Sequence, residues 1–235
     1  MKKQKIIAIV GPTASGKSAV ALALAKKFDG ELIAADSRTV YKGMDIGTAK
    51  LISTIPSVAE RSLRSSFVLG RDGIKQWGID LVNPDEEFNA FQFKEYAGQK
   101  IKEIITRGKV PIIVGGTGLY IQALIDNFDF EGKAGELRFN VLQIGIKWPR
   151  EELYKRIDAR VDKMIENGLI EEVKGLKGQY GCDIKSMTGI GYRQICQFLN
   201  KEIDETEMIR LIKRDSRRYA KRQITWFKRD SRINW

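Results

Sequence analysis

Histidine is absent from this sequence of 235 residues. That absence excludes an imidazole base, a Ser–His nucleophile pair and a histidine metal ligand, so acid–base chemistry must use carboxylates, lysine, tyrosine or water. Cysteine is scarce as well: Cys182 and Cys196 have no spacing typical of a metal or redox site. We therefore expect two reduced cysteines with a structural role.

Long apolar runs are also missing. None approaches the roughly 20 residues that a membrane-spanning helix requires. The charged start Met1-Lys2-Lys3 leads through a short apolar run directly into a glycine-rich loop, unlike a signal peptide. These observations predict a cytoplasmic protein that is not bound to a membrane.

Acidic residues are too few to balance the basic ones. The 41 Lys and Arg residues stand against 30 Asp and Glu residues, a net charge of +11. The excess is uneven, since Arg210–Trp235 holds ten basic residues and only two acidic ones. Such a concentration of positive charge indicates a polyanionic partner, most simply a nucleic acid.

The clearest motif is the run Gly11-Pro12-Thr13-Ala14-Ser15-Gly16-Lys17-Ser18. It matches the phosphate-binding pattern G-x-x-x-x-G-K-[ST] of nucleotide-binding and ATP-binding proteins. Loop amides and the start of the following helix can hold a phosphate group. Lys17 would add positive charge, and the Ser18 hydroxyl is a candidate ligand for Mg²⁺. The motif alone indicates a polyphosphate ligand and leaves the reaction open.

The order of apolar and amphipathic segments predicts an α/β fold, a P-loop NTPase-like parallel sheet flanked by helices, with an α-helical C-terminal part. Strands are expected at residues 6–10, 31–35, 77–82, 110–114 and 141–146. Helices are expected at residues 19–28, 89–107, 119–126, 149–167 and 169–176, in a segment that ends near Asn200, and at 204–228. Residues 51–75 are expected to form short helix and loop.

Two strand ends carry polar residues. Asp36 follows the strand at 31–35, and Gly115-Gly116-Thr117-Gly118 follows the strand at 110–114. Because ligands bind at the carboxyl ends of strands in an open α/β sheet, both ends should face one cleft beside the phosphate loop. On position alone, Asp36 is equally compatible with a turn or a helix cap. The missing acid after residue 114 argues against an ordinary P-loop kinase, which holds a second magnesium-binding Asp there.

Six runs follow one another along the chain. They are Gly11–Ser18, Asp36–Tyr41, Asp45–Lys50, Gly115–Tyr120, Ile190–Gln194 and Tyr219–Gln223. Together they resemble the tRNA dimethylallyltransferase family, from residue 6 to the C-terminus. The resemblance implies transfer of a dimethylallyl group from dimethylallyl diphosphate to N6 of the adenosine 3′-adjacent to the anticodon of a tRNA, with release of diphosphate.

The resemblance also implies roles for single residues. The loop Gly11–Ser18 would hold the diphosphate, with Mg²⁺ as cofactor at Ser18. Asp36 would act as the base for the N6 amine, Thr117 would contact the target nucleotide and Arg160 would bind the diphosphate. The residues expected to contact tRNA are Asp36, Ser37, Arg38, Thr39, Thr117, Gly191, Tyr192, Arg193, Arg214, Arg217 and Lys221. The alternatives are a turn hydroxyl for Thr117 and a solvated charge for Arg160.

The basic final helix is expected to lie along the anticodon arm of the tRNA. Its cations recur at steps of three, four or seven, which places them on one face: Arg210, Arg214, Arg217, Lys221 and Lys228. Three apolar residues recur at steps of seven on the opposite side, where they can pack on the domain: Ile212, Tyr219 and Trp226. A solvated face without a partner is the alternative.

The chain departs from the family pattern in two places. Thr39 stands where the family commonly has Gln. The family also inserts a helical domain after the helix at 119–126, and most of that insertion is absent here, near residues 126–140. We expect residues 1–147 to form the P-loop core and residues 148–235 a helical part that packs on it and contributes to tRNA binding, in a monomer.

Other functions are compatible with part of this pattern. An adenylate isopentenyltransferase shares the loop and the aspartate but modifies a free nucleotide, and the missing insertion slightly favours it. A basic RNA-binding protein with a relict phosphate loop is a third possibility. The presence of Lys17, Ser18, Asp36 and Thr117 argues against such a loss of function.

Overall fold

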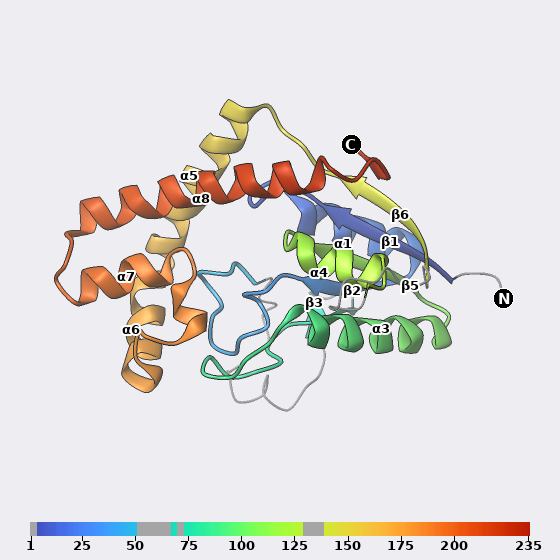
Figure 1. Cartoon of the computed structure of the whole chain (residues 1–235), viewed down its shortest axis with the longest axis horizontal. Coiled ribbons are helices and arrows are strands. Elements are labelled where there is room, and N and C mark those ends of the chain that lie inside the picture. Colours follow the sequence, from blue (N-terminus) through green and yellow to red (C-terminus); the bar gives the residue numbers. More distant parts are fainter. Residues whose placement is uncertain (1–3, 51–66, 70–72, 129–138) are drawn as a thin grey trace.

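A computed structural model of the chain describes residues 4–50, 67–69, 73–128 and 139–235 (Figure 1). Within these residues lies a seven-stranded sheet with the strand order β3-β4-β2-β5-β1-β6-β7. Neighbouring strands are parallel except for the antiparallel edge pair β3–β4. The expected α/β class with a parallel sheet is therefore confirmed. The strands are β1 (Gln4–Val10), β2 (Gly30–Ala35), β3 (Phe67–Leu69), β4 (Ile74–Trp77), β5 (Val110–Gly115), β6 (Phe139–Gly145) and β7 (Ile233–Asn234).

Helices cover both faces of the sheet. α1 (Lys17–Phe28) packs on one face, against a cluster that includes Ile9, whereas α3 (Ala90–Thr106) and α4 (Gly118–Ile125) pack on the other, against a cluster that includes Ala8. Successive residues of a strand point to opposite faces, so a strand covered on both sides must be apolar throughout. This requirement explains why the central strands stand out as continuous apolar runs.

A group of helices follows the sheet along the chain and lies at one end of it (Figure 1). Its members are α5 (Arg150–Glu166), α6 (Leu169–Tyr180), the short 3₁₀ helix η1 (Lys185–Thr188), α7 (Tyr192–Leu199) and α8 (Glu205–Phe227). Their apolar core also takes in Val40, Tyr41 and Met44, which follow β2. α8 then extends back over the sheet, so the group is packed on the core and not merely tethered to it (Figure 1).

Most of the expected elements are confirmed, with three differences. The strand expected at 77–82 is wrong: β4 is Ile74–Trp77, and the chain then bends because Gly78 and Asp80 have φ of 82° and 51°. α6 continues past Leu176 to Tyr180. Of the region expected as short helix and loop, residues 51–66 and 70–72 lie outside the described residues, and the described remainder contains β3 and the first half of β4, so the expectation is wrong there.

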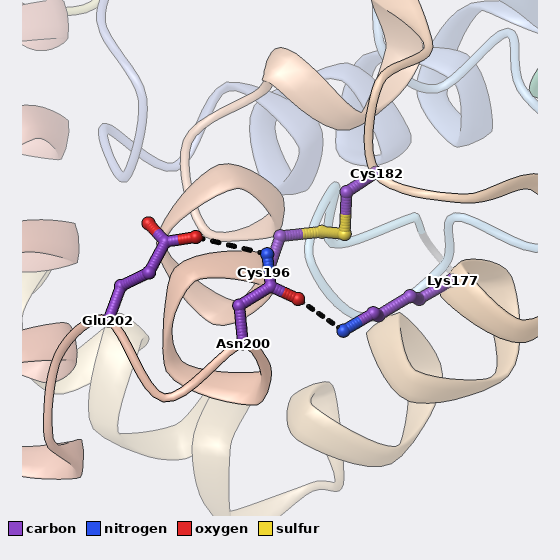
Figure 2. Close-up of a disulfide and its surroundings, with 5 residues drawn as sticks. All are labelled: Lys177, Cys182, Cys196, Asn200 and Glu202. Atoms are coloured by element: carbon purple, nitrogen blue, oxygen red, sulfur yellow. Dashed lines mark hydrogen bonds between the residues drawn. A yellow bond between two sulfur atoms is a disulfide. The ribbon is translucent and has the colours of Figure 1, made fainter.

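The two cysteines form a disulfide, so the expectation of reduced thiols is wrong (Figure 2). After α6 the chain turns back onto α7, which brings the Cα atoms of Cys182 and Cys196 to 6.1 Å, within the range that a disulfide spans. Beside the bond, Lys177 Nζ donates to Asn200 Oδ1 at 2.5 Å. The disulfide therefore closes a loop that contains η1 and the start of α7.

None of the helices in the described ranges is long and apolar enough to cross a membrane.

The packing of Gly47 generates a stability prediction. A Cβ atom at Gly47 would lie 2.6 Å from Cε2 of Tyr192, so Gly47→Ala should lower the free energy of unfolding by about 1–3 kcal/mol through overpacking. A Cβ atom at Gly175 in α6 would meet nothing within 4 Å, and Gly175→Ala should raise that free energy by about 0.5–1 kcal/mol. Urea denaturation measures both. Equal unfolding midpoints for the two variants would contradict this packing.

Candidate active site

The phosphate-loop motif connects β1 to α1, as its pattern requires. Two glycines shape the connection. Gly11 has φ 144°, and a Cβ atom there would lie 2.6 Å from the carbonyl oxygen of Ile146, while Gly16 caps α1 in the left-handed region at φ 87°. Neither position accepts a larger residue without strain. The sequence therefore folds this stretch into one defined loop, from which Lys17 and Ser18 start the first turn of α1.

The outer side of the loop is held by residues that belong to the helical part. Arg156 Nε of α5 donates to the carbonyl oxygen of Ala14 at 3.2 Å, and the indole nitrogen of Trp148 donates to that of Ser15 at 2.9 Å. The guanidinium of Arg156 also lies 4.3 Å from the Trp148 ring centroid. The carbonyl oxygens of Ala14 and Ser15 thus accept hydrogen bonds from residues outside the phosphate loop.

Gln223 of α8 holds the inner end of the same loop. Its side chain is buried, with Oε1 accepting from the backbone N–H of Thr13 at 2.7 Å and Nε2 donating to the carbonyl oxygen of Gly116 at 2.9 Å. A Cβ atom at Gly116 would collide with the Gln223 amide. One side chain therefore connects α8 to the phosphate loop and to the end of β5.

The ends of β2 and β5 meet, as their polar residues predict. The hydroxyl of Thr117 accepts from the backbone N–H of Ser37 at 3.0 Å and lies 3.5 Å from the Ser37 hydroxyl. One oxygen of Asp36 accepts from the backbone N–H of Arg38 at 2.8 Å. This contact stabilises a turn, which was one of the roles that the position of Asp36 in the sequence allowed. Asp36 is half-buried and lines a cavity, so the turn leaves it exposed toward that space.

Three charged side chains interact beside the loop. Burial, and after it the neighbouring positive charge of Arg160, lower the pKa of Lys17 to about 7, although the Asp36 carboxylate opposes both effects. Burial also lowers the pKa of Arg160, again opposed by Asp36. Lys17 Nζ donates to the carbonyl oxygen of Pro12 at 2.5 Å. The structure therefore brings together Lys17, Asp36 and Arg160, which lie far apart in the sequence.

Two cavities adjoin these charges. The first, of about 550 Å³, lies between the loop and the helical part, and its lining includes Asp36, Arg160 and Tyr219. The second, of about 660 Å³, is lined by Ser15–Ser18, by Arg160 and by residues of the segment 45–50. The two linings share Ala14, Arg160 and Met164. Arg160 thus stands where the two cavities meet, which a surface helix charge would not do.

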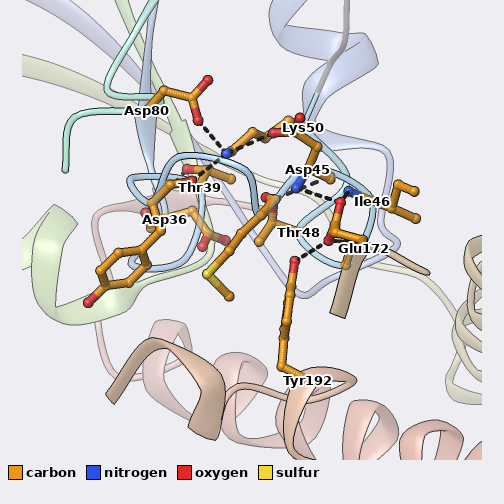
Figure 3. A network of polar contacts seen from close by, with 12 residues as sticks. Asp36, Thr39, Asp45, Ile46, Thr48, Lys50, Asp80, Glu172 and Tyr192 are labelled. Carbon is orange, nitrogen blue, oxygen red and sulfur yellow. Dashed lines mark hydrogen bonds and ion pairs between the residues drawn. The ribbon is translucent and has the colours of Figure 1, made fainter. Parts of the chain in front are cut away.

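The segment 45–50 is fixed by a carboxylate from α6 (Figure 3). Glu172 accepts the backbone N–H groups of Asp45, Ile46 and Gly47 at 2.9, 2.6 and 3.2 Å, and the Tyr192 hydroxyl donates to it at 2.6 Å. Burial and the Glu172 carboxylate raise the pKa of Tyr192. Successive backbone N–H groups commonly form such an anion site; here the anion is a side chain of the protein.

A buried lysine completes the network in Figure 3. Lys50 Nζ lies 3.0 Å from Asp45 Oδ1 and 2.5 Å from Asp80 Oδ1, and donates to the carbonyl oxygen of Tyr41 at 2.5 Å. Removing one partner of a buried ion pair leaves a charge without compensation. The segment therefore forms a rigid wall shared by both cavities.

The residues expected to contact tRNA separate into two groups. Ser37, Arg38, Gly191, Arg193 and Arg214 line the first cavity, as Asp36 does. Thr39 and Tyr192 are buried, at 9% and 1% exposure, and Tyr192 supports Glu172. The expected contact with RNA therefore has no exposed surface at these two positions. Thr117 connects the two strand ends and is not in the cavity lining.

The cations expected on one face of α8 are not all free, because Arg210 is paired with Glu207 and others contact different parts of the protein. Arg217 forms an ion pair with Asp158 of α5 at 2.7 Å. The cations that line the first cavity are Arg214, Arg218 and Arg222, spaced by one helical turn, while Lys221 and Lys228 face a groove beside α5. The expected packing is confirmed for Ile212, which is buried, whereas Trp226 lies against Gly118 but is 38% exposed and Tyr219 lines the first cavity.

Sequence reasoning missed the supporting residues Trp148, Arg156, Glu172 and Gln223. Only Gln223 left a usable signal, because it is a polar residue on the buried stripe of α8 that contains Ala220 and Phe227. A polar side chain at a buried position requires hydrogen-bond partners.

Known proteins resemble this chain over nearly its whole length. A family model described as IPP transferase matches residues 39–138 and 129–230. A protein of Geotalea uraniireducens named tRNA dimethylallyltransferase 2 is 37% identical over 99% of this chain and 92% of its own length.

Two solved structures share the fold. The tRNA delta(2)-isopentenylpyrophosphate transferase of Staphylococcus epidermidis has a TM-score of 0.85 and 35% identity, over 99% of this chain and 93% of that one. A eukaryotic dimethylallyltransferase acting on tRNA has a TM-score of 0.77 and 26% identity, over 95% of this chain and 70% of that one.

The alignments also show a difference in length. The alignment with the Geotalea protein extends over 300 positions, although this chain has 235 residues, so at least 65 positions have no counterpart here. The two segments matched by the family model meet at residues 129–138.

The charges beside the loop predict how Lys17 titrates. Arg160→Gln should raise the Lys17 pKa above about 7 because it removes a neighbouring positive charge, and Asp36→Asn should lower it because it removes a negative one. NMR titration of ¹³C-labelled lysine ε-carbons measures this, with Lys17→Arg to assign the signal. A Lys17 signal that titrates at the ordinary value of 10.5 in the unchanged protein would contradict its burial.

Proposed function

The chain belongs to the IPP transferase family of tRNA prenyltransferases, and we propose that it transfers a dimethylallyl group from dimethylallyl diphosphate to N6 of the adenosine 3′-adjacent to the anticodon. The observation that carries this proposal is the pair of cavities that meet at Arg160. One side offers a phosphate loop and the other offers Asp36, so donor and acceptor can approach each other from two sides. β5 ends in Gly115 and is followed by Gly116-Thr117, without the second magnesium-binding Asp of a P-loop kinase.

The second cavity is proposed to bind the donor. Its lining contains the last loop residues, together with the side chains of Lys17 and Arg160. As the bond between C1 of the dimethylallyl group and the diphosphate oxygen breaks, negative charge grows on the diphosphate. Positive groups fixed in place before the reaction stabilise such charge without reorganisation. Lys17 and Arg160 would fill that role, and the diphosphate would in turn favour protonated Lys17.

The first cavity is proposed to bind the adenosine. The bond between C1 and N6 forms while the N6 proton passes to the Asp36 carboxylate, which lines this cavity. The oxygen of Asp36 that accepts from the Arg38 N–H keeps the carboxylate oriented. Enzymes that act on a base take it out of the stack, and a cavity of about 550 Å³ is large enough to receive one.

Magnesium fits the donor side of the site. Among the described residues no group of three His, Cys, Asp or Glu side chains forms a metal cage, and Mg²⁺ commonly uses one or two protein ligands together with substrate phosphates and water. The Ser18 hydroxyl lies in the second cavity beside Lys17 and is the proposed ligand. When bound, the ion would neutralise charge on the leaving diphosphate.

The mouth of the first cavity is suited to a polyanion. Asp215 is shared by Arg193, Arg214 and Arg218 at 3.1, 2.9 and 3.9 Å, so one carboxylate stands against three guanidinium groups. Arg222 adds a further cation to the lining. Such an excess attracts phosphates and positions RNA without reading its sequence, which favours tRNA over a free nucleotide as acceptor.

These assignments give the two parts of the chain different roles. We propose that residues 1–147 supply the phosphate loop and the base, that residues 148–235 supply Arg160 and the tRNA-binding cations, and that most of the missing alignment positions correspond to an insertion near residues 126–140.

Asp36 gives the proposal its direct test. Radiolabelled dimethylallyl diphosphate is offered with tRNA, with AMP and with neither, and only tRNA should become labelled. Asp36→Asn keeps the size of the side chain but removes the proton acceptor, so kcat should fall by about 10²–10⁴ while the tRNA Kd changes little. Labelled AMP would support the free-nucleotide alternative, and a near-normal kcat would leave Asp36 as a turn residue only.

A further inference from the structure

A second basic surface lies on the flank of α8 next to the one that lines the first cavity. It is a groove of about 440 Å³ between α5 and α8, here called the α5–α8 groove. Its apolar part is formed by Tyr154, Ile224 and Trp235, with Trp148 at the end near the phosphate loop. Its basic part is formed by Lys147, Arg150, Lys221 and Lys228.

The charge of the groove is of one sign. Four cationic side chains line it and no acidic side chain does. Lys147, Lys221 and Lys228 are exposed, and none of them takes part in the ion pairs found among the described residues. Some other cations of α8 are compensated one to one, as Arg217 is by Asp158 and Lys213 is by Asp162. The groove therefore has charge available for a ligand.

The aromatic residues of the groove are unusually exposed for their size. Trp148 and Trp235 are 39% and 40% exposed. Trp235 is fixed by its contact with Gly145, where a Cβ atom would lie 2.6 Å from the indole ring. A rigid exposed ring among lysines is the combination that proteins use to bind unpaired nucleotides, because the ring stacks on a base and the cations hold the phosphates.

The groove and the first cavity lie on neighbouring faces of one helix. Arg218 and Arg222 of α8 line the cavity, while Lys221 and Lys228 line the groove. A helix with its side chains is about 10–12 Å across, so an RNA strand that enters the cavity needs only to cross α8 to reach the groove. This chain also lacks at least 65 positions of its Geotalea relative. Its remaining surfaces must therefore make a larger share of the contacts with RNA.

We propose that the α5–α8 groove binds unpaired nucleotides of the substrate tRNA that flank the reacting adenosine, with Trp235 stacking on a base and the lysines contacting phosphates. The proposal rests on the proposed function, since it takes tRNA as the acceptor. It separates two tasks on α8: the arginines guide the adenosine into the cavity, and the groove holds the neighbouring strand.

The charge part is tested with two matched variants of the full chain. One carries Lys147→Gln, Lys221→Gln and Lys228→Gln; the control carries Lys5→Gln, Lys27→Gln and Lys102→Gln, three exposed lysines on the core. The tRNA Kd is measured over a range of salt concentrations. Each phosphate contact contributes roughly −0.7 to −0.9 to the log–log slope, so the groove variant should flatten the slope by about two to three and the control should not. The KM for the donor should stay unchanged in both.

The stacking part is tested at Trp235. Trp235→Ala should weaken tRNA binding by about 5- to 100-fold, the loss of one stacked base, without altering the salt slope. Trp235→Phe should restore most of the affinity because it keeps a ring. Unfolding midpoints in urea confirm that the variants are folded.

Three outcomes would contradict the proposal that the α5–α8 groove binds unpaired nucleotides. The first is equal slopes for groove and control variants with an unchanged Kd for Trp235→Ala. The second is a groove variant that binds tRNA as the unchanged protein does but no longer binds a polyglutamate peptide. That result would mean that the groove binds an acidic protein segment. The third is an unchanged protein that neither binds nor labels tRNA, which overturns the proposed function as well.

Discussion

The phosphate loop depends on hydrogen bonds that come from outside it. The carbonyl oxygens of Ala14 and Ser15 accept from Arg156 and Trp148, and the Thr13 N–H donates to Gln223. A buried backbone group left without a partner costs about 1–3 kcal/mol, so the loop conformation seen here requires α5 and α8 in their places. The helical part therefore supports the proposed donor site as well as carrying the proposed surface for RNA. Because Gln223 and the cavity-lining arginines share α8, the acceptor side and the loop are mechanically connected.

The sequence predicts those parts of the fold that depend on the pattern of neighbouring residues. Continuous apolar runs identified the strands covered on both faces, and glycines at fixed spacing identified the loop. The strand expected at 77–82 failed because Trp77, Ile79 and Leu81 alternate as in a strand, while Gly78 and Asp80 adopt positive φ between them. The disulfide was missed for a related reason, since residue spacing does not reveal where a chain turns back on itself.

The residues of the candidate site that follow strand ends could be predicted from the sequence, whereas the residues that hold the phosphate loop and the segment 45–50 in place could not. Parallel strands bring their carboxyl ends to one edge, which is why Asp36 and Thr117 could be expected together. Within a motif, however, neighbours differ: Gly191 and Arg193 line the first cavity, whereas Tyr192 between them is buried and holds Glu172. Gln223 and the loop residue that it binds are 210 positions apart. Such pairs depend on the three-dimensional packing of α8, which local patterns do not contain.

The net charge of the chain is a poor guide to its RNA surface until the ion pairs are known. The periodicity of α8 suggested one basic face, but Arg217 and Lys213 are neutralised by α5 and Arg210 by Glu207. What remains uncompensated lies in two places, the arginines around Asp215 at the first cavity and the lysines of the α5–α8 groove. Binding to phosphates follows the uncompensated charge, because a cation already paired gives up one partner to gain another. Under the proposed function, the surface that binds RNA is therefore set by which carboxylates α5 presents to α8, and the positive charge of α8 would be divided between guiding the adenosine into the first cavity and holding the neighbouring strand.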